Sequence, residues 1–378
     1  MKKLFIIVNH DWFFLSHRKD IALEAKNKGW NVTIVASNTG CFDDIKALGL
    51  NVIDLPINAT GMNPVEEIKT FAFLWRLYKK ECPDVVHHVG LKTILWGGLA
   101  AKFAKIKGVV NAVSGLGIIF NEEKLSLVAK VILAVLRFSH KRDGIRVIFQ
   151  NHEDEALFYK YHIASCDKSV FIKGSGVNLD DYTYSSEPES KKIRVMFTAR
   201  MVIEKGVLVL AEAAELLRKE YKDKVEFILC GGLSGNPKAL KKEQIEAICD
   251  GSYIQWLGHR NDVKILLRQC HIVAFPSYYR EGVPKSLIEA CASGRPIITT
   301  NSIGCKDTVD DGVNGYIVPI KNVEVLAEKL KTLIDDKEKR IEMGRQSRIK
   351  AEKEFSLKDV VRKHMDCYES LFGDNCIK

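Results

Sequence analysis

The chain has 378 residues, of which 46% are hydrophobic and 28% are charged. This length predicts two domains, and the composition excludes an intrinsically disordered chain. The 57 lysines and arginines exceed the 48 aspartates and glutamates, which gives a formal net charge of +9. That excess fits a phosphate-bearing substrate, an anionic membrane surface or nucleic acid, and it does not choose among them.

The cysteines and the N-terminus bear on the cellular compartment. Ten cysteines are scattered without a Cys-x-x-Cys pair or a cluster of cysteine and histidine, so we expect reduced thiols and no zinc site or disulfide framework. The apolar run from Leu4 to Val8 is too short for a signal peptide. No stretch approaches the roughly 18 uninterrupted apolar residues of a membrane-spanning helix. We therefore expect a cytoplasmic protein.

Strand and helix patterns alternate through the first part of the chain, as in βαβ units with a parallel sheet. The predicted strands are 4–8, 31–36, 51–55, 85–88, 109–113 and 146–150, and the predicted helices are 16–28, 64–82 and 93–105. This alternation predicts an N-terminal doubly wound domain over residues 1–174.

Residues 175–192 are rich in serine, glycine and acidic residues without periodicity, which predicts a linker. A second alternation follows over residues 193–355. Its predicted strands are 193–198, 225–230, 253–257, 272–275, 296–300 and 316–318, and its predicted helices are 206–221, one from 237, 262–269, 284–293 and 322–335. We expect two α/β domains that face each other across a cleft, with a C-terminal helix in 356–378 packing back on the first domain.

Open parallel sheets bind ligands at the carboxyl ends of their strands. In FTARMVIEKG, Arg200 follows a predicted strand and Lys205 precedes a predicted helix. Two cations at a helix N-terminus suit a diphosphate, although both can also be ordinary solvated charges. Gly231 follows the next predicted strand, where it lets the backbone either approach a ligand or simply turn.

The stretch REGVPKSLIEACASGRP carries two carboxylates around a helix start. Pro284 suits the first helical turn and Gly294 suits the C′ position. Glu281 precedes this predicted helix and Glu289 lies in its second turn. Backbone N–H groups of Val283 to Ser286 can receive an anion while the carboxylates accept from hydroxyl groups. A nucleoside diphosphate sugar has both kinds of group.

EGVPKSLIEA, with its Glu-x7-Glu spacing, and the preceding Arg200-x4-Lys205-Gly206 resemble the retaining GT-B glycosyltransferases called group 1 or family 4. The resemblance extends over nearly the whole chain, including DGVNGYIVP at 311–319. It implies the GT-B fold, which consists of two Rossmann-like domains, and transfer of a sugar from its nucleotide to an acceptor hydroxyl with retention. Related enzymes are usually metal-independent, and the chain has no Asp-x-Asp triplet.

The resemblance also implies roles for the donor-side residues. Glu289 would bind the ribose hydroxyls, Glu281 the hydroxyls of the donor sugar, and Arg200 with Lys205 the diphosphate. Further donor contacts would come from the backbone of the helix start and from the loops after two strands: Gly282, Val283, Pro284, Lys285, Gly231, His259 and Arg260. No cofactor or metal is expected, because the donor is itself a substrate and is expected to be UDP-linked.

The first domain would hold the acceptor. The candidate residues end three predicted strands: His17 and Arg18 in NHDWFFLSHR, His88 and Lys92 in an HxxxK pattern, and Ser114 with Gly115 in SGLG. Trp12, Phe13 and Phe14 of the first of these loops either bind the acceptor or pack beneath the loop. Several relatives carry a histidine near the SGLG loop, where this chain has Ser114, so no general base is assigned.

The likeness to bacterial enzymes that extend lipid-linked oligosaccharides implies a lipid-linked saccharide acceptor and a peripheral place on the cytoplasmic face of the inner membrane. The apolar, basic stretch 124–142 either lies on a membrane surface or packs on the sheet. A non-hydrolysing sugar-nucleotide epimerase and an inactive nucleotide-sugar-binding protein are the alternatives. Nucleic acid is not an expected partner, because no recognition module accompanies the basic charge.

Overall fold

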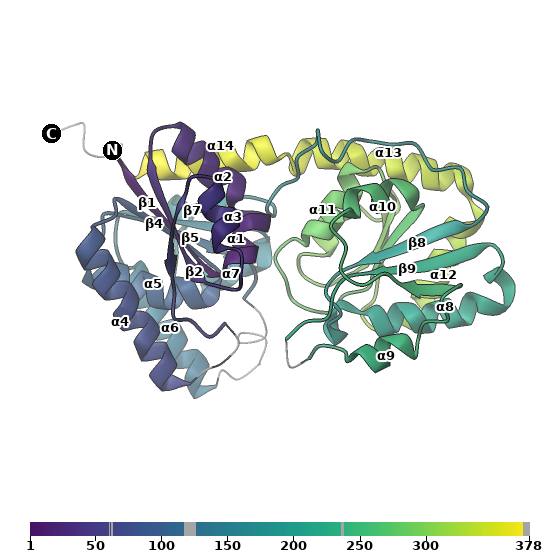
Figure 1. Ribbon diagram of the computed structural model, residues 1–378, viewed down its shortest axis with the longest axis horizontal. Helices are drawn as coiled ribbons and strands as arrows, with labels where there is room; N and C mark the ends of the chain where they lie inside the picture. Colours follow the sequence, from purple (N-terminus) through teal and green to yellow (C-terminus); the bar gives the residue numbers. More distant parts are fainter. Residues whose placement is uncertain (60, 62, 117–125, 236–237, 373–378) are drawn as a thin grey trace. The chain divides into compact units, whose positions relative to one another are not determined.

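The computed structural model describes residues 1–59, 61, 63–116, 126–235 and 238–372. The chain forms two compact units, Met1–Ser175 with Lys358–Lys378, and Gly176–Leu357 (Figure 1). Each unit is built around its own parallel sheet. Within the described ranges, no helix combines the length and the apolar character needed to cross a membrane.

The first unit contains a seven-stranded parallel sheet in the order β3-β2-β1-β4-β5-β6-β7. Its strands are β1 (Lys3–His10), β2 (Asn31–Ser37), β3 (Asn51–Asp54), β4 (Val85–Val89), β5 (Gly108–Val113), β6 (Ile145–Phe149) and β7 (Ser169–Phe171). Its helices are α1 (Asp11–His17), α2 (Lys19–Asn27), α3 (Phe42–Ala47), α4 (Pro64–Glu81), α5 (Leu91–Phe103), α6 (Leu127–His140), α7 (His152–Lys160) and α14 (Leu357–Ser370), with the 3₁₀ turn η1 (Cys166–Lys168).

Helices cover both faces of this sheet, so strand β1 is apolar on both sides, as parallel strands usually are. Leu4 and Ile6 face a core shared with α2 and α14. Phe5 and Ile7 face the opposite core, which is shared with α4, α5 and α6. Helix α14, the yellow helix beside the first unit in Figure 1, buries Tyr368 against this sheet. The last helix of the chain therefore belongs to the first unit.

The second unit contains a six-stranded parallel sheet in the order β10-β9-β8-β11-β12-β13. Its strands are β8 (Ile193–Thr198), β9 (Val225–Cys230), β10 (Ile254–Trp256), β11 (Ile272–Phe275), β12 (Ile297–Thr300) and β13 (Gly315–Val318). Its helices are α8 (Val207–Tyr221), α9 (Lys242–Glu246), α10 (Val263–Gln269), α11 (Lys285–Ala292), α12 (Val323–Asp335) and α13 (Lys337–Glu354), with the 3₁₀ turns η2 (Ile203–Lys205) and η3 (Lys306–Thr308).

Two expected helices differ from the observed ones. The single helix expected over residues 16–28 is two helices separated by Arg18, whose ψ of −5° and φ of −132° are not helical. The long helix expected from residue 237 is the short α9, which begins only at Lys242. The spacing of a leucine and several lysines in this stretch is typical of a helix, but residues 238–241 do not form one.

The polar helix α13 was missed because its sequence has few apolar residues. It is held instead by buried charged groups, since Arg340 forms two hydrogen bonds of 2.8 Å with the carboxylate of Glu187 and donates to two carbonyls at the end of α12. Glu187 lies in the segment expected to be a linker, and Ser185 of the same segment accepts from Arg295. The structure places residues 176–192 within the second unit.

Candidate active site

Strands β8 and β11 are neighbours in the sheet of the second unit, and the loops after them bring Lys205 and Glu281 together. Lys205 ends η2, and its ammonium group donates to Oε2 of Glu281. The two side chains are 14% and 15% exposed. A cation and a carboxylate are therefore held side by side, largely out of water, at the carboxyl end of the sheet, where such folds bind ligands.

Ser277 fixes the other oxygen of Glu281. Its hydroxyl lies 3.1 Å from Oε1 of Glu281, and the residue is fully buried. The carbonyl of Ser277 accepts from the hydroxyls of Thr300 and Ser302 at the end of β12. Sequence reasoning missed Ser277, although its place two residues after β11, at the ligand-binding edge of the sheet, is a signal that could have found it.

Aromatic rings surround the ammonium group of Lys205. It lies 5.6 Å from the ring centre of Phe275 and 5.8 Å from that of Tyr279. Cations at such distances are attracted to the ring faces. The rings limit access of water to this cation, which strengthens its interaction with any anion that approaches.

Two glycines allow the loops of this site to approach one another. Gly206, next to Lys205, has a φ of +84°, and a Cβ atom there would lie 2.0 Å from the carbonyl oxygen of Pro276. Gly304 has a φ of +86°, and its Cβ would lie 2.0 Å from the carbonyl oxygen of Gly282. Larger residues would push the loops apart.

Glu289 lies in helix α11 and is the more enclosed of the two glutamates. Burial raises the pKa of its carboxyl group above the usual range, while the Lys285 ammonium, 3.9 Å away, and a hydrogen bond from the hydroxyl of Tyr182 oppose that rise. Tyr182 lies in the segment expected to be a linker, where no sequence pattern marked it. Glu289 is thus an enclosed carboxylate beside a tyrosine hydroxyl and a lysine ammonium group.

Helix α11 starts at Lys285, one residue later than expected, and Pro284 is its N-cap. Its first N–H groups have no acceptor within the helix, as at any helix start. At its other end Gly294 lies at C′ with a φ of +73°. The N–H groups of Gly294 and Arg295 bond to the carbonyls of Cys291 and Ala290, which is the Schellman pattern.

The other donor-side candidates lie on loops after β8, β9 and β10. Arg200 is exposed just beyond β8. Gly231 follows β9, and a Cβ atom at this residue would lie 1.7 Å from the carbonyl oxygen of Ala199. His259 Nε2 is 3.1 Å from the side-chain oxygen of Asn261, and the Arg260 guanidinium binds both oxygens of Asp262 at 2.8 and 2.5 Å.

The acceptor-side candidates of the first unit are more enclosed than expected. Arg18 is only 2% exposed, and burial lowers the pKa of its guanidinium to about 10, although Tyr368 of α14 opposes that fall. It points inward because it lies at the break between α1 and α2, facing the core that α14 covers. His17 is partly exposed, and its ring stacks on Phe13 with ring centres 4.3 Å apart.

His88 and Lys92 are both bound to neighbouring groups. The ring nitrogens of His88 are 2.9 Å from the Tyr78 hydroxyl and 2.8 Å from Oδ1 of Asn111, and burial lowers the pKa of the ring to about 4. Lys92 lies 2.6 Å from the carboxylate of Glu67. In this structure the HxxxK pattern thus contributes to the core and to the attachment of α4, and His88 offers no ring nitrogen to a ligand.

Ser114 and Gly115 follow β5, at the carboxyl edge of the first sheet. Both are partly exposed, and Gly115 has a φ of +104°. Gly117, the last residue of the SGLG motif, lies outside the described residues. Across the described ranges, no group of three or more histidine, cysteine or acidic side chains is arranged to hold a metal ion.

Comparison with known protein families divides the chain into nearly the same two parts as the two compact units of the structure. Residues 181–350 match the family described as glycosyl transferases group 1, and residues 3–151 match glycosyl transferase 4-like. A glycosyltransferase of Campylobacter jejuni is 30% identical over 354 residues, which cover 88% of this chain and 91% of that protein. The chain belongs to the group 1 glycosyltransferases.

The Campylobacter jejuni relative is named N,N'-diacetylbacillosaminyl-diphospho-undecaprenol alpha-1,3-N-acetylgalactosaminyltransferase. A relative from Escherichia coli, UDP-Gal:alpha-D-GlcNAc-diphosphoundecaprenol alpha-1,3-galactosyltransferase, is 25% identical, over 90% of this glycosyltransferase and 89% of that protein.

Solved structures share the fold of this glycosyltransferase. A Rickettsia africae glycosyltransferase superposes with a TM-score of 0.80 at 20% identity, covering 99% of both chains. Anabaena HepE in complex with UDP superposes with a TM-score of 0.77 at 19% identity, covering 98% of this chain and 100% of that one. The two parallel-sheet units therefore form the GT-B fold, as the sequence motifs predicted.

Proposed function

We propose that this glycosyltransferase moves a hexose or an N-acetylhexosamine from a UDP-sugar, with retention, to a hydroxyl of a polyprenyl-diphosphate-linked saccharide. The product would enter a bacterial surface polysaccharide, and the enzyme would work at the cytoplasmic face of the inner membrane. The observation that carries the proposal is the Lys205–Glu281 pair at the carboxyl edge of the second sheet, with Glu289 on the helix that follows.

The donor roles follow from the charges at this edge. Lys205 and Arg200 would stabilise the negative charge that develops on the departing diphosphate, as preorganised cations do in a site that excludes water. Glu281 would bind hydroxyls of the donor sugar, and Ser277 would keep its carboxylate in place. Glu289 would accept hydrogen bonds from the ribose hydroxyls. Before the donor binds, Lys205 and Glu281 neutralise each other.

The proposed reaction exchanges one bond at the anomeric carbon for another. The bond between that carbon and the diphosphate oxygen breaks, and a bond to the acceptor oxygen forms on the same face of the sugar. The acceptor proton passes to the leaving diphosphate, so no separate base is needed. Both glutamates serve in binding, unlike the nucleophile and acid/base pair of a retaining glycosidase.

The names of the two relatives support the acceptor and the stereochemistry. Both name an undecaprenyl-diphosphate saccharide as acceptor and an alpha-1,3 linkage as product, and one names UDP-Gal as donor. A UDP-hexose of this kind carries its sugar in the α configuration, so an α-linked product requires retention. Family membership favours transfer over the epimerase alternative.

Thermal unfolding against UDP, GDP and ADP tests the donor, with Glu289→Ala alongside. Ligand at a hundred times its dissociation constant adds about 2.7 kcal/mol to the free energy of unfolding. We expect a UDP-selective rise in Tm that Glu289→Ala abolishes. Incubation with UDP-sugars and a polyprenyl-diphosphate saccharide then tests transfer. A UDP-dependent shift without any transfer would instead support the inactive binding protein.

A further inference from the structure

Tyr182, in the segment 176–192, contacts the carboxylate of Glu289 on helix α11. The hydroxyl of Tyr182 donates a hydrogen bond to that carboxylate, and its ring packs against the core of the second unit. Burial and the negative charge of Glu289 raise the pKa of the Tyr182 phenol above its usual range. The hydroxyl therefore keeps its proton at neutral pH and serves Glu289 as a donor.

Arg348 of helix α13 fixes the backbone of Tyr182 relative to α11. Its Nη1 group donates to the carbonyl of Tyr182 at 2.7 Å and to the carbonyl of Ala292 at 2.8 Å. Ala292 is the last residue of α11. Arg348 therefore joins the chain at Tyr182 to the helix that carries Glu289, and this link is independent of the contact between the two side chains.

A turn before Tyr182 adds to this anchoring. The N–H of Tyr182 bonds to the carbonyl of Asn178 at 3.0 Å. The side chain of Asn178 accepts from the N–H of Asp180 at 3.0 Å and donates to the carboxylate of Asp181 at 2.9 Å. Asparagine side chains that bond to the backbone two residues on stabilise a turn. Tyr182 is thus held by its own backbone before its hydroxyl contacts Glu289.

The contact with Tyr182 gives the carboxylate of Glu289 a fixed direction. The Glu289 side chain is 12% exposed, and the ammonium group of Lys285 is 3.9 Å from its carboxylate, which is longer than a direct hydrogen bond. A glutamate side chain has several rotatable torsions, and a hydrogen bond to its carboxylate limits the positions of its oxygens. Since a carboxylate has about four acceptor sites, one bond from Tyr182 leaves others for the hydroxyls of a ligand.

We propose that Tyr182 positions Glu289 for the ribose hydroxyls of the donor, so that the pair makes the enzyme select ribonucleotides over deoxyribonucleotides. The inference rests on the proposed function, in which Glu289 accepts hydrogen bonds from the ribose. Tyr182 acts through Glu289, because its hydroxyl is bound to the carboxylate. A carboxylate that is already ordered loses little further freedom when the ribose binds. A donor without these hydroxyls leaves the enclosed carboxylate without their hydrogen bonds, which costs affinity.

Calorimetric titration of the full chain with UDP and with 2′,3′-dideoxy-UDP tests the proposal. The second nucleotide lacks the two ribose hydroxyls and keeps the base and the diphosphate. We expect the wild type to bind UDP roughly 10- to 100-fold more tightly, since hydrogen bonds to a charged group are the stronger ones. Tyr182→Phe should weaken UDP binding about tenfold and dideoxy-UDP binding by less than about twofold. A purely structural role would weaken both alike.

Tyr253→Phe is the matched control within the second unit. The hydroxyl of Tyr253 donates to the carbonyl of Ala214 at 2.9 Å and is buried. The substitution therefore also removes one hydrogen bond of a tyrosine hydroxyl, but at a place that does not involve Glu289. Its Tm should fall, while its preference for UDP over dideoxy-UDP should equal that of the wild type.

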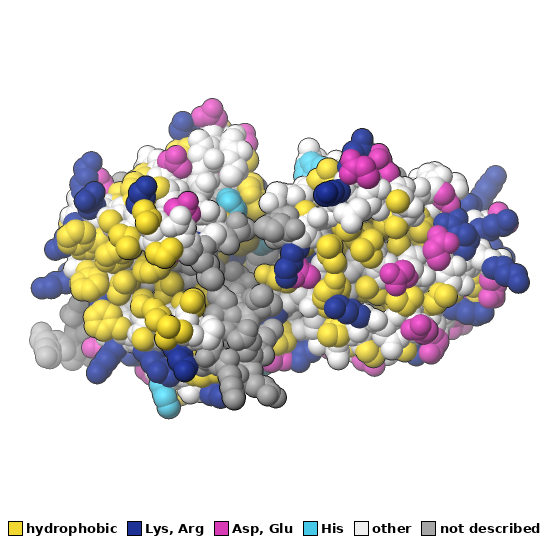
Figure 2. Space-filling view, turned by 90° about the horizontal axis from the view of Figure 1, so that it is seen from below, with side chains coloured by type: hydrophobic (Ala, Val, Ile, Leu, Met, Phe, Trp, Pro, Cys, Tyr) yellow, Lys and Arg dark blue, Asp and Glu magenta, His cyan; other side chains and the backbone are white. Residues whose placement is uncertain are grey.

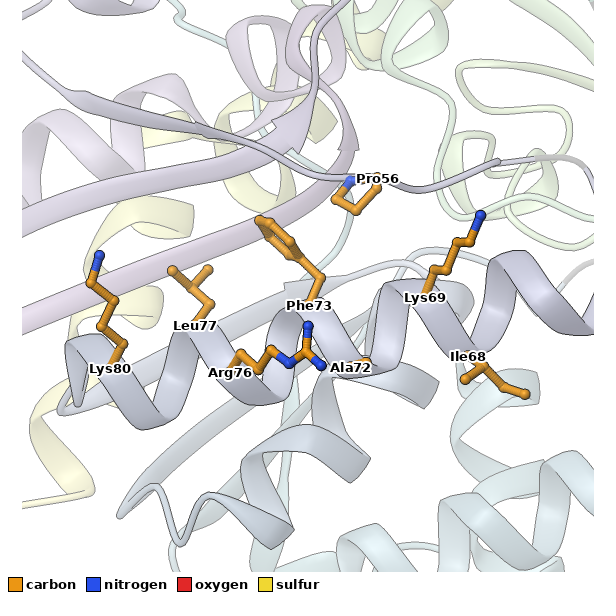
Figure 3. A pocket seen from close by; sticks show the side chains of 8 residues that line it. All are labelled: Pro56, Ile68, Lys69, Ala72, Phe73, Arg76, Leu77 and Lys80. Atoms are coloured by element: carbon orange, nitrogen blue, oxygen red, sulfur yellow. The ribbon is translucent and has the colours of Figure 1, made fainter.

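Cations outside the donor site are a second control, because a diphosphate can also meet them. Figure 2 shows lysines and arginines on the surface of both units. Lys69, Arg76 and Lys80 line a pocket of about 610 Å³ along α4, and Figure 3 shows them spread along this helix. The eight described residues that line the pocket include no carboxylate, so a nucleotide bound there gains nothing from its ribose hydroxyls. Lys69→Ala, Arg76→Ala and Lys80→Ala together should leave the preference for UDP unchanged.

Two results would overturn the proposal while leaving the donor site in place. A Tyr182→Phe variant that keeps the wild-type affinity and preference for UDP would show that Glu289 needs no such positioning. An equal loss for both nucleotides would show that the Tyr182 hydroxyl only stabilises the fold near α11. A wild type that binds both nucleotides equally would separate Glu289 from the ribose, and the donor role on which the inference rests would fail with it.

Discussion

The ammonium group of Lys205 donates to the carboxylate of Glu281, although 76 residues separate them in the chain. The contact exists because β8 and β11 are adjacent in the sheet while β9 and β10 lie on the other side of β8. The proposed cation for the leaving diphosphate and the proposed carboxylate for the sugar are thereby placed at one point. Under the proposed function, donor binding would loosen this pair, and the enzyme would exchange an internal contact for contacts with its substrate.

Replacing Lys205 should therefore impair the chemical step. Lys205→Ala removes a preorganised cation from a site where charge develops, and removing one such group typically costs about 100- to 1,000-fold in rate. We expect that loss in kcat/KM together with a lower Tm, because the substitution leaves the largely buried Glu281 carboxylate without its cation. The exposed Lys219 of α8 provides the control, and turnover equal to that of Lys219→Ala would remove Lys205 from the leaving-group role.

Ser277 should act through Glu281 and not on the donor directly. Ser277→Ala removes the hydrogen bond to Oε1 of Glu281, and we expect roughly a tenfold loss of kcat/KM, comparable to a bond made to a charged group. A double-mutant cycle separates this role from simple destabilisation. In a Glu281→Ala background the same substitution should have little further effect on kcat/KM, and a full additive loss would contradict the positioning role.

The two sheets could be predicted from the sequence because buried parallel strands are short apolar runs. Leu4–Val8 within β1 and Ile272–Phe275 are fully buried runs of this kind. The polar helix α13 could not be predicted, because Arg340 stabilises it through Glu187, 153 residues away. Apolar periodicity carries no information about such a contact.

Only those residues of the candidate site that belong to a motif within one loop could be predicted from the sequence. The Glu-x7-Glu spacing placed Glu281 before a helix and Glu289 within it. The partners Ser277 and Tyr182 were missed because they belong to no motif. They contact Glu281 and Glu289 only once the chain has folded. The HxxxK pattern has a different limit, because the sequence does not tell whether His88 is buried or exposed.

Glu289→Gln should stabilise the ligand-free protein at neutral pH while weakening UDP binding. Burial raises the pKa of Glu289 above its ordinary value of 4.5, so its charge costs folding free energy. The folded state then holds the proton more tightly than the unfolded state, and wild-type stability falls as pH rises above about 4.5 through the raised pKa. The Tm advantage of Glu289→Gln should be larger at pH 8 than at pH 5. Glu352→Gln, at an exposed ion pair, should show no such trend.

Asp11 should have the opposite pH dependence. Burial by itself would raise its pKa, but the Thr39 hydroxyl and the N–H groups of Thr39, Cys41 and Trp12 bond to the carboxylate and bring the pKa below the ordinary 3.8. Its contribution to stability is complete above pH 3.8 and is lost as pH falls through the lowered pKa. Asp11→Asn should cost about 1.5–3 kcal/mol at pH 7 and reduce the acid sensitivity of unfolding. Denaturant midpoints from pH 2 to 7 provide the measurement, and an unchanged midpoint at pH 7 would contradict it.

Gly206→Ala should disrupt the site by moving the loop that carries Lys205. The new Cβ would meet the carbonyl oxygen of Pro276 at 2.0 Å, in addition to the strain of a φ of +84°. Gly251→Ala is the matched control, because its φ is +75° with nothing within 4 Å of the added Cβ. That control should lose only the roughly 1–2 kcal/mol of the left-handed conformation, whereas Gly206→Ala should lose more stability and most UDP affinity. Urea unfolding with UDP titration compares the two, and equal losses would show that the close approach to β11 is not needed.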